Sequence, residues 1–292
     1  MRNNFLNSSR VLSSHGQEKD KQFISYKCRQ RLGAGGCSVQ YYTTMRLILL
    51  AVTLCLAHGK IIQLPSYFKV CARSDPNFNE CALKNGREII PHLVKGEKTF
   101  NLPPLDPFEV KVMNLSEGQG EGQLNLTMRD VKLHGLRHAY LQNYSTDFDK
   151  GHKSMLLTVP QLKVLATYNA SGHILLVPIR GTGNINITLV DTKCMVRYHF
   201  MKQKINGVDQ GQIIATTVHL DPKRMYIHLD NLFNGDKGLG NQMNKLLDEN
   251  WKEVFDEITP HIAGSFIEMF RGLANGFAKS IPYDLLFPET LS

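Results

Sequence analysis

The stretch NQMNKLLDENWKEVFDEITPHIAGSFIEMFRGLANGFAKSI, residues 241–281, carries one apolar stripe that decides the fold. Its apolar positions recur at steps of three, four or seven residues, which is the period of one helix face. They are Met243, Leu247, Val254, Ile258, Ile262, Phe266, Met269, Leu273, Phe277 and Ile281. A helix of this length spans about 60 Å at 1.5 Å per residue. We therefore predict a very long helix, which needs an apolar partner along its whole length.

The opposite face of this stretch is polar, which excludes a membrane-spanning helix. It carries Lys245, Asp248, Glu249, Lys252, Glu253, Asp256 and Glu257. Pro260 interrupts the stretch. Because proline has no backbone N–H and its ring clashes with the preceding turn, Pro260 is expected to kink the helix or to split it in two.

Residues 108–233 supply the partner, because apolar and polar side chains alternate along them. The alternating segments are 110–112, 124–128, 162–168, 185–189, 196–200 and 225–229. Such segments with one polar face are typical of antiparallel strands. Turns containing Gly or Asn are expected at 169–172, 180–183, 206–207 and 234–235. The pattern predicts an α+β fold in which a highly curved antiparallel sheet grips the long C-terminal helix around an apolar interior.

A secretory signal peptide is predicted inside the chain at residues 45–59. Met45 and Arg46 precede an apolar run at 47–57, and His58-Gly59 ends the segment. The positive residue, the run length and the small residues at the end fit a signal peptide, and the run is too short to span a bilayer comfortably. The rival interpretation is a buried helix or a signal anchor. Residues 1–44 are then a disordered upstream extension, either an artefact of the gene model or an alternative start, and residues 60–292 form one domain.

The positive charge of the whole chain lies mostly outside that domain. Of the 34 Lys and Arg residues eight precede Lys60, and of the 26 Asp and Glu residues only two do. The formal net charge of +8 therefore falls to +2 for residues 60–292. A basic surface for binding nucleic acid is not supported, so no nucleic-acid partner is expected.

The cysteines agree with secretion. Cys71 and Cys81 bracket a short polar loop and are predicted to form a disulfide, which is worth about 2–3 kcal/mol in the chain-entropy model. Cys194 has no evident partner. A zinc site at Cys71, Cys81 and His92 would need a fourth ligand that no spacing supplies, so no metal and no cofactor is predicted. Five Asn-x-Ser/Thr sequons are candidate glycosylation sites: Asn114, Asn125, Asn143, Asn169 and Asn186.

No catalytic constellation is visible, so the sequence does not indicate an enzyme. The chain contains no G-x-S-x-G, H-E-x-x-H or P-loop motif. The acids of 248–257 lie on the predicted polar helix face, and the histidines are dispersed and pair with no evident nucleophile.

Both ends of the domain resemble a known family. Cys71-Ala-Arg-Ser-Asp-Pro-Asn-Phe-Asn-Glu-Cys81 precedes a short predicted helix at 81–93 with Asn79 as its N-cap. With this helix it is similar to the N-terminal motif of the takeout / juvenile-hormone-binding protein family of insects. Asn-Trp-Lys-Glu-Val-Phe at 250–255 and Ile-Pro-Tyr-Asp-Leu-Leu-Phe-Pro at 281–288 resemble its C-terminal motif. The likeness covers about residues 61–291.

The resemblance implies a long helix wrapped in a curved antiparallel sheet, related to the tubular lipid-binding (TULIP, BPI-like) proteins. It also implies a protein that carries an apolar ligand in haemolymph or chemosensory fluid, such as juvenile hormone, another terpenoid or a fatty-acyl molecule. The hormone-carrier branch typically has a second disulfide. Because Cys194 stands alone here, the chain resembles takeout more closely than the hormone carriers.

We therefore expect a secreted carrier with an apolar tunnel, without stable insertion into a membrane. The alternative is a secreted interaction or signalling protein that acts through a receptor or partner, with structural filling inside. The candidate ligand contacts are Phe255, Ile258, Ile262, Phe266, Met269, Phe270, Leu273, Val164, Tyr168, Tyr198 and Phe200. The two tyrosines are candidates for orienting a polar headgroup. For any single one of these residues ordinary core packing is favoured somewhat over ligand contact, because periodicity does not separate the two.

Overall fold

Two long strands, β4 (His152–Ile174) and β5 (Val177–Ile205), form an antiparallel ribbon to which the rest of the sheet is attached. The computed structural model describes residues 63–117 and 124–291, apart from the side chains of residues 261–263. The predicted extension at 1–44 and the predicted signal peptide at 45–59 lie outside the described residues.

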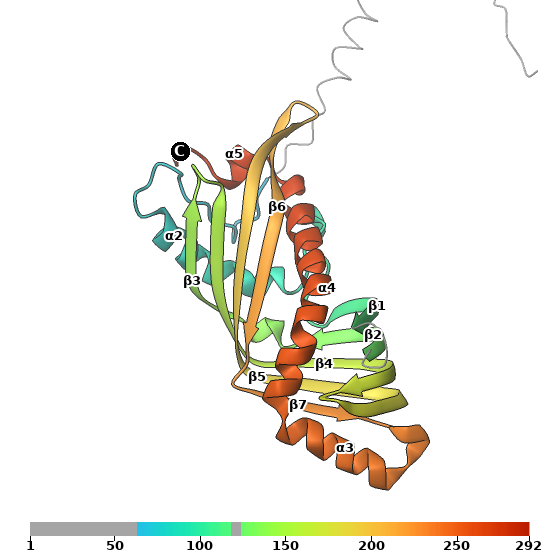
Figure 1. The fold of residues 1–292 in the computed structure, drawn as a ribbon. Helices are drawn as coiled ribbons and strands as arrows, with labels where there is room; N and C mark the ends of the chain where they lie inside the picture. Colours follow the sequence, from blue (N-terminus) through green and yellow to red (C-terminus); the bar gives the residue numbers. More distant parts are fainter. Residues whose placement is uncertain (1–62, 118–123, 292) are drawn as a thin grey trace, which may run out of the picture. The chain divides into compact units, whose positions relative to one another are not determined.

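The remaining strands add to the two free sides of this ribbon (Figure 1). They are β1 (Phe108–Glu117), β2 (Leu124–His134), β3 (Tyr140–Asp147), β6 (Val208–Asp221) and β7 (Arg224–Leu229). The order is β1-β2-β4-β5-β6, with β3 also paired to β4 and β7 also paired to β5. Every pairing is antiparallel, as predicted.

The ribbon bends at Pro160 and Asp191, where its pairing is interrupted. Pro160 cannot donate a backbone hydrogen bond, and Asp191 has a φ of 47°. The partners of the ribbon change at this level: β3 and β6 pair on one side of the bend, and β2 and β7 pair on the other. Figure 1 shows that the two halves of the sheet run in different directions, so the predicted curvature is concentrated here.

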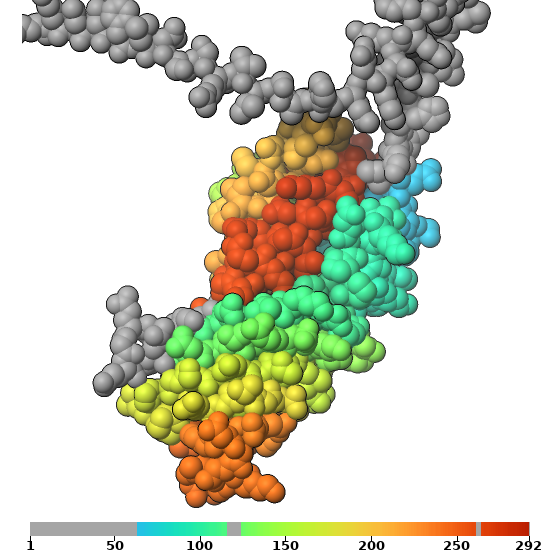
Figure 2. Space-filling model, turned by 90° about the vertical axis from the view of Figure 1, so that its right-hand side faces the viewer, coloured from blue at the N-terminus to red at the C-terminus, as the bar shows by residue number. Residues whose placement is uncertain are grey.

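The helices pack on this sheet (Figure 1). They are α2 (Phe78–Leu93), α3 (Lys237–Glu249), α4 (Trp251–Ser280) and α5 (Tyr283–Leu286), with 3-10 turns η1 (Lys98–Phe100), η2 (Leu136–His138) and η3 (Phe233–Gly235). α2 packs on β3, α3 packs on β7, and α4 contacts β1, β6 and β7. The sheet covers one side of α4 and is not closed into a barrel. Figure 2 shows α4 (red) at the surface beside β6 (gold).

The predicted C-terminal helical stretch is confirmed, but it is interrupted at Asn250 and not at Pro260. The Asn250 backbone has φ −105° and ψ 34°, and its side-chain Nδ2 donates to Leu246 O at 2.8 Å, which closes α3. Pro260 lies inside α4 on the exposed face. Solvent can hydrate the carbonyl that this proline leaves unbonded, so a split at Pro260 was the wrong prediction.

Two of the predicted turns are also wrong, because residues 169–172 and 180–183 pair with each other inside β4 and β5. The turn of this hairpin is Leu175-Leu176, whose φ angles are 51° and 65°. Leu175 N donates to both carboxylate oxygens of Glu257 on α4, at 3.3 and 3.1 Å. Gly183 does not form a turn. It allows the backbone of β5 to lie close to that of Asp230, because a Cβ at this position would be 2.5 Å from Asp230 O. The turn predicted at 206–207 is confirmed.

At the N-terminal end, the predicted disulfide between Cys71 and Cys81 is present, with the two Cα atoms 6.1 Å apart. The predicted helix exists, but α2 begins at Phe78 and its N-cap position is Asn77. Asn79, the predicted N-cap, instead accepts a hydrogen bond at Oδ1 from Thr146 N at 2.8 Å. This bond joins α2 to β3, so the side chain is used in tertiary packing.

Two asparagines fasten the C-terminal helices to free edges of the sheet. Asn244 on α3 accepts from Leu229 N and donates to Leu229 O, both at 2.9 Å. Asn275 on α4 accepts from Ile213 N at 2.7 Å and donates to Ile213 O at 3.1 Å. Each amide thus replaces the neighbouring strand that the edges of β7 and β6 lack.

Asn275→Ala is expected to lower the free energy of unfolding by about 1–2 kcal/mol, because Ile213 N–H and C=O both lose a part-buried partner. Urea unfolding measures this change. Gln203→Ala, at an exposed position on β5, is the control and should stay within about 0.5 kcal/mol of the wild type. Equal stability of both variants would show that the Asn275 amide does not hold α4 to the sheet.

Candidate functional site

Three cavities follow α4 along the inner face of the sheet. The first has a volume of about 70 Å³ and the second about 40 Å³. Both are bordered by Val164, Ile187 and Phe266, so these side chains separate one from the other. Val164 and Ile187 are paired across β4 and β5, on the part of the ribbon that also pairs β2 and β7. Among the side chains that the structure describes, those that line these two cavities are all apolar except Thr259.

The third cavity is the largest of these three, with a volume of about 360 Å³. Its walls come from the other half of the sheet and from the later turns of α4. The residues are Leu93, Leu102, Leu105, Tyr144, Lys153, Met155, Tyr198, Phe200, Gly211, Gln212, Ile213, Phe270, Leu273, Ala274, Phe277, Ala278, Tyr283, Leu286 and Phe287. This cavity combines a predominantly apolar wall with a few polar groups, which is typical of small-molecule sites.

Lys153 is the polar group that stands out in this wall. Only 5% of the residue is exposed, and its Nζ lies 3.6 Å from the centre of the Phe287 ring and 4.5 Å from that of Phe200. No carboxylate within the described residues forms an ion pair with it. Burial lowers the pKa of Lys153 to about 7, because the charged ammonium loses its hydration.

Two tyrosines extend this polar spot across the sheet. Tyr198 on β5 is the register partner of Lys153 on β4, and Tyr144 on β3 is paired with Met155, two residues further along β4. Burial raises the pKa of Tyr144 to about 12 and raises that of Tyr198 well above its usual value. Both phenols therefore remain protonated at neutral pH and can donate a hydrogen bond.

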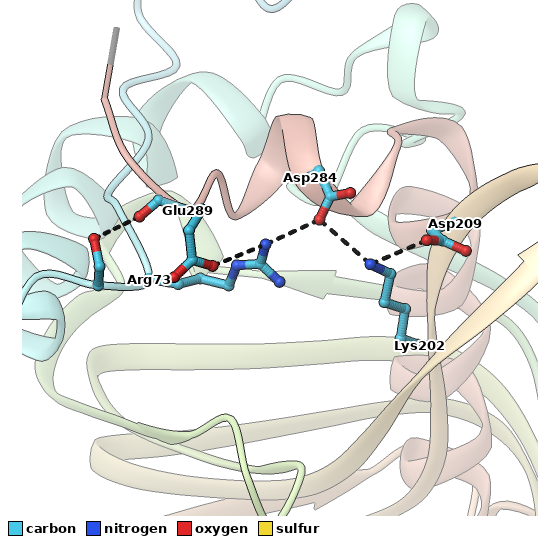
Figure 3. A network of polar contacts seen from close by, with 6 residues as sticks. Arg73, Lys202, Asp209, Asp284 and Glu289 are labelled. Carbon is cyan, nitrogen blue, oxygen red and sulfur yellow. Dashed lines mark hydrogen bonds and ion pairs between the residues drawn. The ribbon is translucent and has the colours of Figure 1, made fainter.

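A C-terminal segment forms the end wall of the third cavity, through Tyr283, Leu286 and Phe287. Figure 3 shows the ion pairs that hold it: Asp284 on α5 lies between Arg73, at 3.1 Å, and Lys202 on β5, at 3.5 Å. Arg73 also pairs with Glu289, and Lys202 with Asp209 (Figure 3). Arg73 N donates to Pro288 O at 2.8 Å, so backbone bonds hold the segment as well.

The carboxylates of Asp284 and Glu289 are exposed, with 58% of the Asp284 side chain accessible to solvent, whereas the Arg73 side chain is 22% accessible. Exposed pairs contribute about 0–1 kcal/mol each. The end wall therefore depends on the packing of Tyr283 and Phe287 and on its backbone bonds, and the charges fix its position.

Most residues predicted as ligand contacts line the cavities. Phe255 and Ile258 border the first cavity, Phe266 and Val164 the first two, and Met269 the second. Phe270, Leu273, Tyr198 and Phe200 border the third. The side chain of Ile262 lies outside the described part of the structure.

Tyr168 is not among the described residues that line the three cavities. It is 2% exposed, and its hydroxyl donates to Asp230 O at 2.6 Å, which fixes the ring in the core. The structure therefore places it on the inner face, as the alternation predicted, but beside Asp230 and away from the cavity walls.

Lys153, Tyr144 and the end wall were not predicted from the sequence. Residues 152–158 show no alternation, because Met155, Leu156 and Leu157 are all apolar. The sequence therefore does not show on which face of the strand Lys153 lies. Its only sequence signal is its position in a long strand, which becomes visible once the pairing with β5 is known.

Neither a metal centre nor a membrane-spanning helix is found in the described residues. No cluster of three or more His, Cys, Asp or Glu side chains there could hold a metal ion. No helix of residues 63–117 and 124–291 has the length and the apolar character that crossing a bilayer requires.

The state of Lys153 predicts a pH dependence of stability. Its pKa is about 7 in the folded protein against 10.5 in the unfolded chain, so between these values the unfolded chain binds a proton that the folded protein does not. The free energy of unfolding should therefore rise with pH by about 1 kcal/mol per unit between pH 7 and 9. Lys153→Met should abolish this slope and be more stable at pH 7.

Urea unfolding at pH 7, 8 and 9 measures the effect. Lys204→Met, at an exposed position on β5, is the matched control and should keep the slope of the wild type. A wild type and a Lys153→Met variant with parallel pH profiles would show that the amine is solvated in the folded state.

Comparison with known proteins agrees with this architecture. Residues 48–288 match the family model described as haemolymph juvenile hormone binding protein (JHBP). The circadian clock-controlled protein daywake of Drosophila melanogaster is 27% identical over 234 residues, which cover 77% of this chain and 88% of that protein. The corresponding protein of Drosophila yakuba is 25% identical over 232 residues, which cover 76% of this chain and 88% of its own length.

The fold is also similar to that of a solved protein. The crystal structure of Epiphyas postvittana Takeout 1 matches with a TM-score of 0.66 and 24% identity, over 75% of this chain and 99% of that one. The curved sheet with its long helix is therefore a takeout-type fold. Because the family model spans residues 48–288, the chain belongs to the haemolymph juvenile hormone binding protein family.

Proposed function

We propose that this protein is a secreted, non-enzymatic carrier that binds an elongated hydrophobic small molecule in the cavities along α4. The observation that supports this most is the row of three cavities with predominantly apolar walls. Membership of a family described by hormone binding in haemolymph points in the same direction.

The third cavity is the proposed main binding site. Its volume of about 360 Å³ falls in the range of roughly 300–1,000 Å³ that is usual for small-molecule sites. An apolar ligand gains about 25 cal/mol for each Å² that leaves water. A chain longer than this cavity would reach towards the second, because Met269 and Phe270 are consecutive on α4 and border one cavity each.

Secretion is part of the proposal. The signal-like segment at 45–59, the disulfide at Cys71 and the sequons support it. Four of the sequon asparagines are exposed, namely Asn114, Asn125, Asn143 and Asn169, and these are the proposed glycosylation sites. Asn186 is less suited to carry a glycan, because it is half-buried and its amide oxygen is buried.

Leu273→Trp should weaken the binding of a neutral apolar fluorescent probe, such as N-phenyl-1-naphthylamine, by at least about tenfold. The indole would fill space in the third cavity, at a cost in stability of roughly 1–3 kcal/mol if that space were instead packed core. Probe titration and thermal melting, on protein from which bound lipid has been extracted, measure the two effects.

Glu253→Gln, on the exposed face of α4, is the control and should alter neither measurement. A Leu273→Trp variant that loses stability and keeps its probe affinity would place the binding site elsewhere. A wild type that binds no apolar probe would favour a secreted interaction protein that acts through a receptor.

N-terminal sequencing of the secreted protein should find a chain that starts near Lys60, because the small residues at Ala57 and Gly59 end the signal-like segment. Expression in insect cells from Met1 and from Met45 should give the same mature terminus. Secreted material that retains residues 1–44 would contradict this assignment.

A further inference from the structure

Lys153 is the one charged side chain among the described residues that line the third cavity. It is nine-tenths buried, and its Nζ forms no hydrogen bond or ion pair with any residue of 63–117 or 124–291. Its surroundings are the rings of Phe287, Phe200 and Phe148, with Nζ to ring-centre distances of 3.6, 4.5 and 5.8 Å. An ammonium in such a place is costly for a protein unless an anion joins it.

The aromatic rings compensate only part of this cost. A cation over an aromatic face gains about 0.5–2 kcal/mol. Burial nevertheless lowers the pKa of Lys153 to about 7, so the rings stabilise the charge less than water would. A methionine or leucine at this position would fill the same space without any charge, which means that packing does not explain the lysine.

We propose that Lys153 is the headgroup site of the third cavity and binds the carboxylate of a long-chain fatty-acid-type ligand. The proposal rests on the carrier function proposed above and names the class of ligand. The hydrocarbon chain would lie along Phe270, Leu273 and Phe277 on α4, opposite the sheet. The carboxylate would supply the negative charge that the cavity wall lacks.

The tyrosines beside Lys153 complete the headgroup site. Tyr198 is next to Lys153 across the sheet, and Tyr144 lies on the adjoining strand. As protonated phenols they donate hydrogen bonds to a carboxylate oxygen that Lys153 does not reach. One ammonium and two neutral donors match a singly charged group with two acceptor oxygens.

The same inventory disfavours other headgroups. An alcohol or an ester leaves the ammonium without a counterion, so its binding includes the cost of a buried charge or of a proton loss. A phosphate monoester carries up to two negative charges at neutral pH, of which a single lysine balances only one. A carboxylate on an unbranched chain is the ligand for which charge and shape agree.

The test compares palmitate with 1-hexadecanol, which has the same chain length and no charge. Each is titrated at pH 7 against a neutral fluorescent probe bound to the full secreted protein after lipid extraction. The wild type should bind palmitate at least about tenfold more tightly than hexadecanol. Lys153→Met should abolish this preference and retain the affinity for hexadecanol.

Lys204→Met removes one exposed positive charge from the same strand pair and should leave the preference unchanged. Lys153→Arg, which keeps a cation at the site, should retain at least part of the preference. Ligand-induced shifts in melting temperature, larger for palmitate than for hexadecanol in the wild type and in Lys204→Met but not in Lys153→Met, provide a second readout that does not depend on the probe.

The possible outcomes separate the two proposals. Equal affinity of the wild type for palmitate and hexadecanol would overturn the headgroup assignment and leave the carrier function intact. So would a palmitate preference that survives in Lys153→Met, because the charge would then act elsewhere. If neither compound displaces a bound probe, the headgroup assignment fails and the carrier function stands; if the wild type binds neither the probe nor either compound, the carrier function itself fails.

Discussion

The missing backbone pairing at Pro160 and Asp191 is the constraint on which the rest of the structure depends. A continuous two-stranded ribbon as long as β4 and β5 would twist evenly along its length. The proline removes a donor at one point, and the positive φ of Asp191 turns the opposite strand. The sheet divides there into two parts with different partners and directions, so its inner face becomes concave.

The concave shape of the sheet determines how α4 packs on it. A helix on a flat sheet buries a narrow strip, whereas α4 faces β1, β6 and β7 and keeps its other side in solvent (Figures 1 and 2). The fit of α4 to the bent sheet is incomplete, and the three cavities lie between them. Glu257 and Asn275 bond α4 to the backbone of the sheet, and Asn244 does the same for α3.

Features that follow from local periodicity were predicted from the sequence, whereas features that depend on contacts between distant segments were not. The stripe from Met243 to Ile281 is visible because one helix face meets one surface. The Leu175-Leu176 turn was not predictable, because leucine is rarely found in tight turns. The backbone N–H of Leu175 is held by Glu257, which is far away in the sequence. Lys153 was hidden for the same reason, since only its pairing with Tyr198 shows that it points inward.

The position of α5 has a consequence for when the binding site comes into existence. Tyr283, Leu286 and Phe287 close the third cavity, and they are synthesised after every other part of its wall. The pocket is open at one end until this segment docks beside Arg73. The docking of this last segment therefore decides when the apolar interior is separated from solvent at this end.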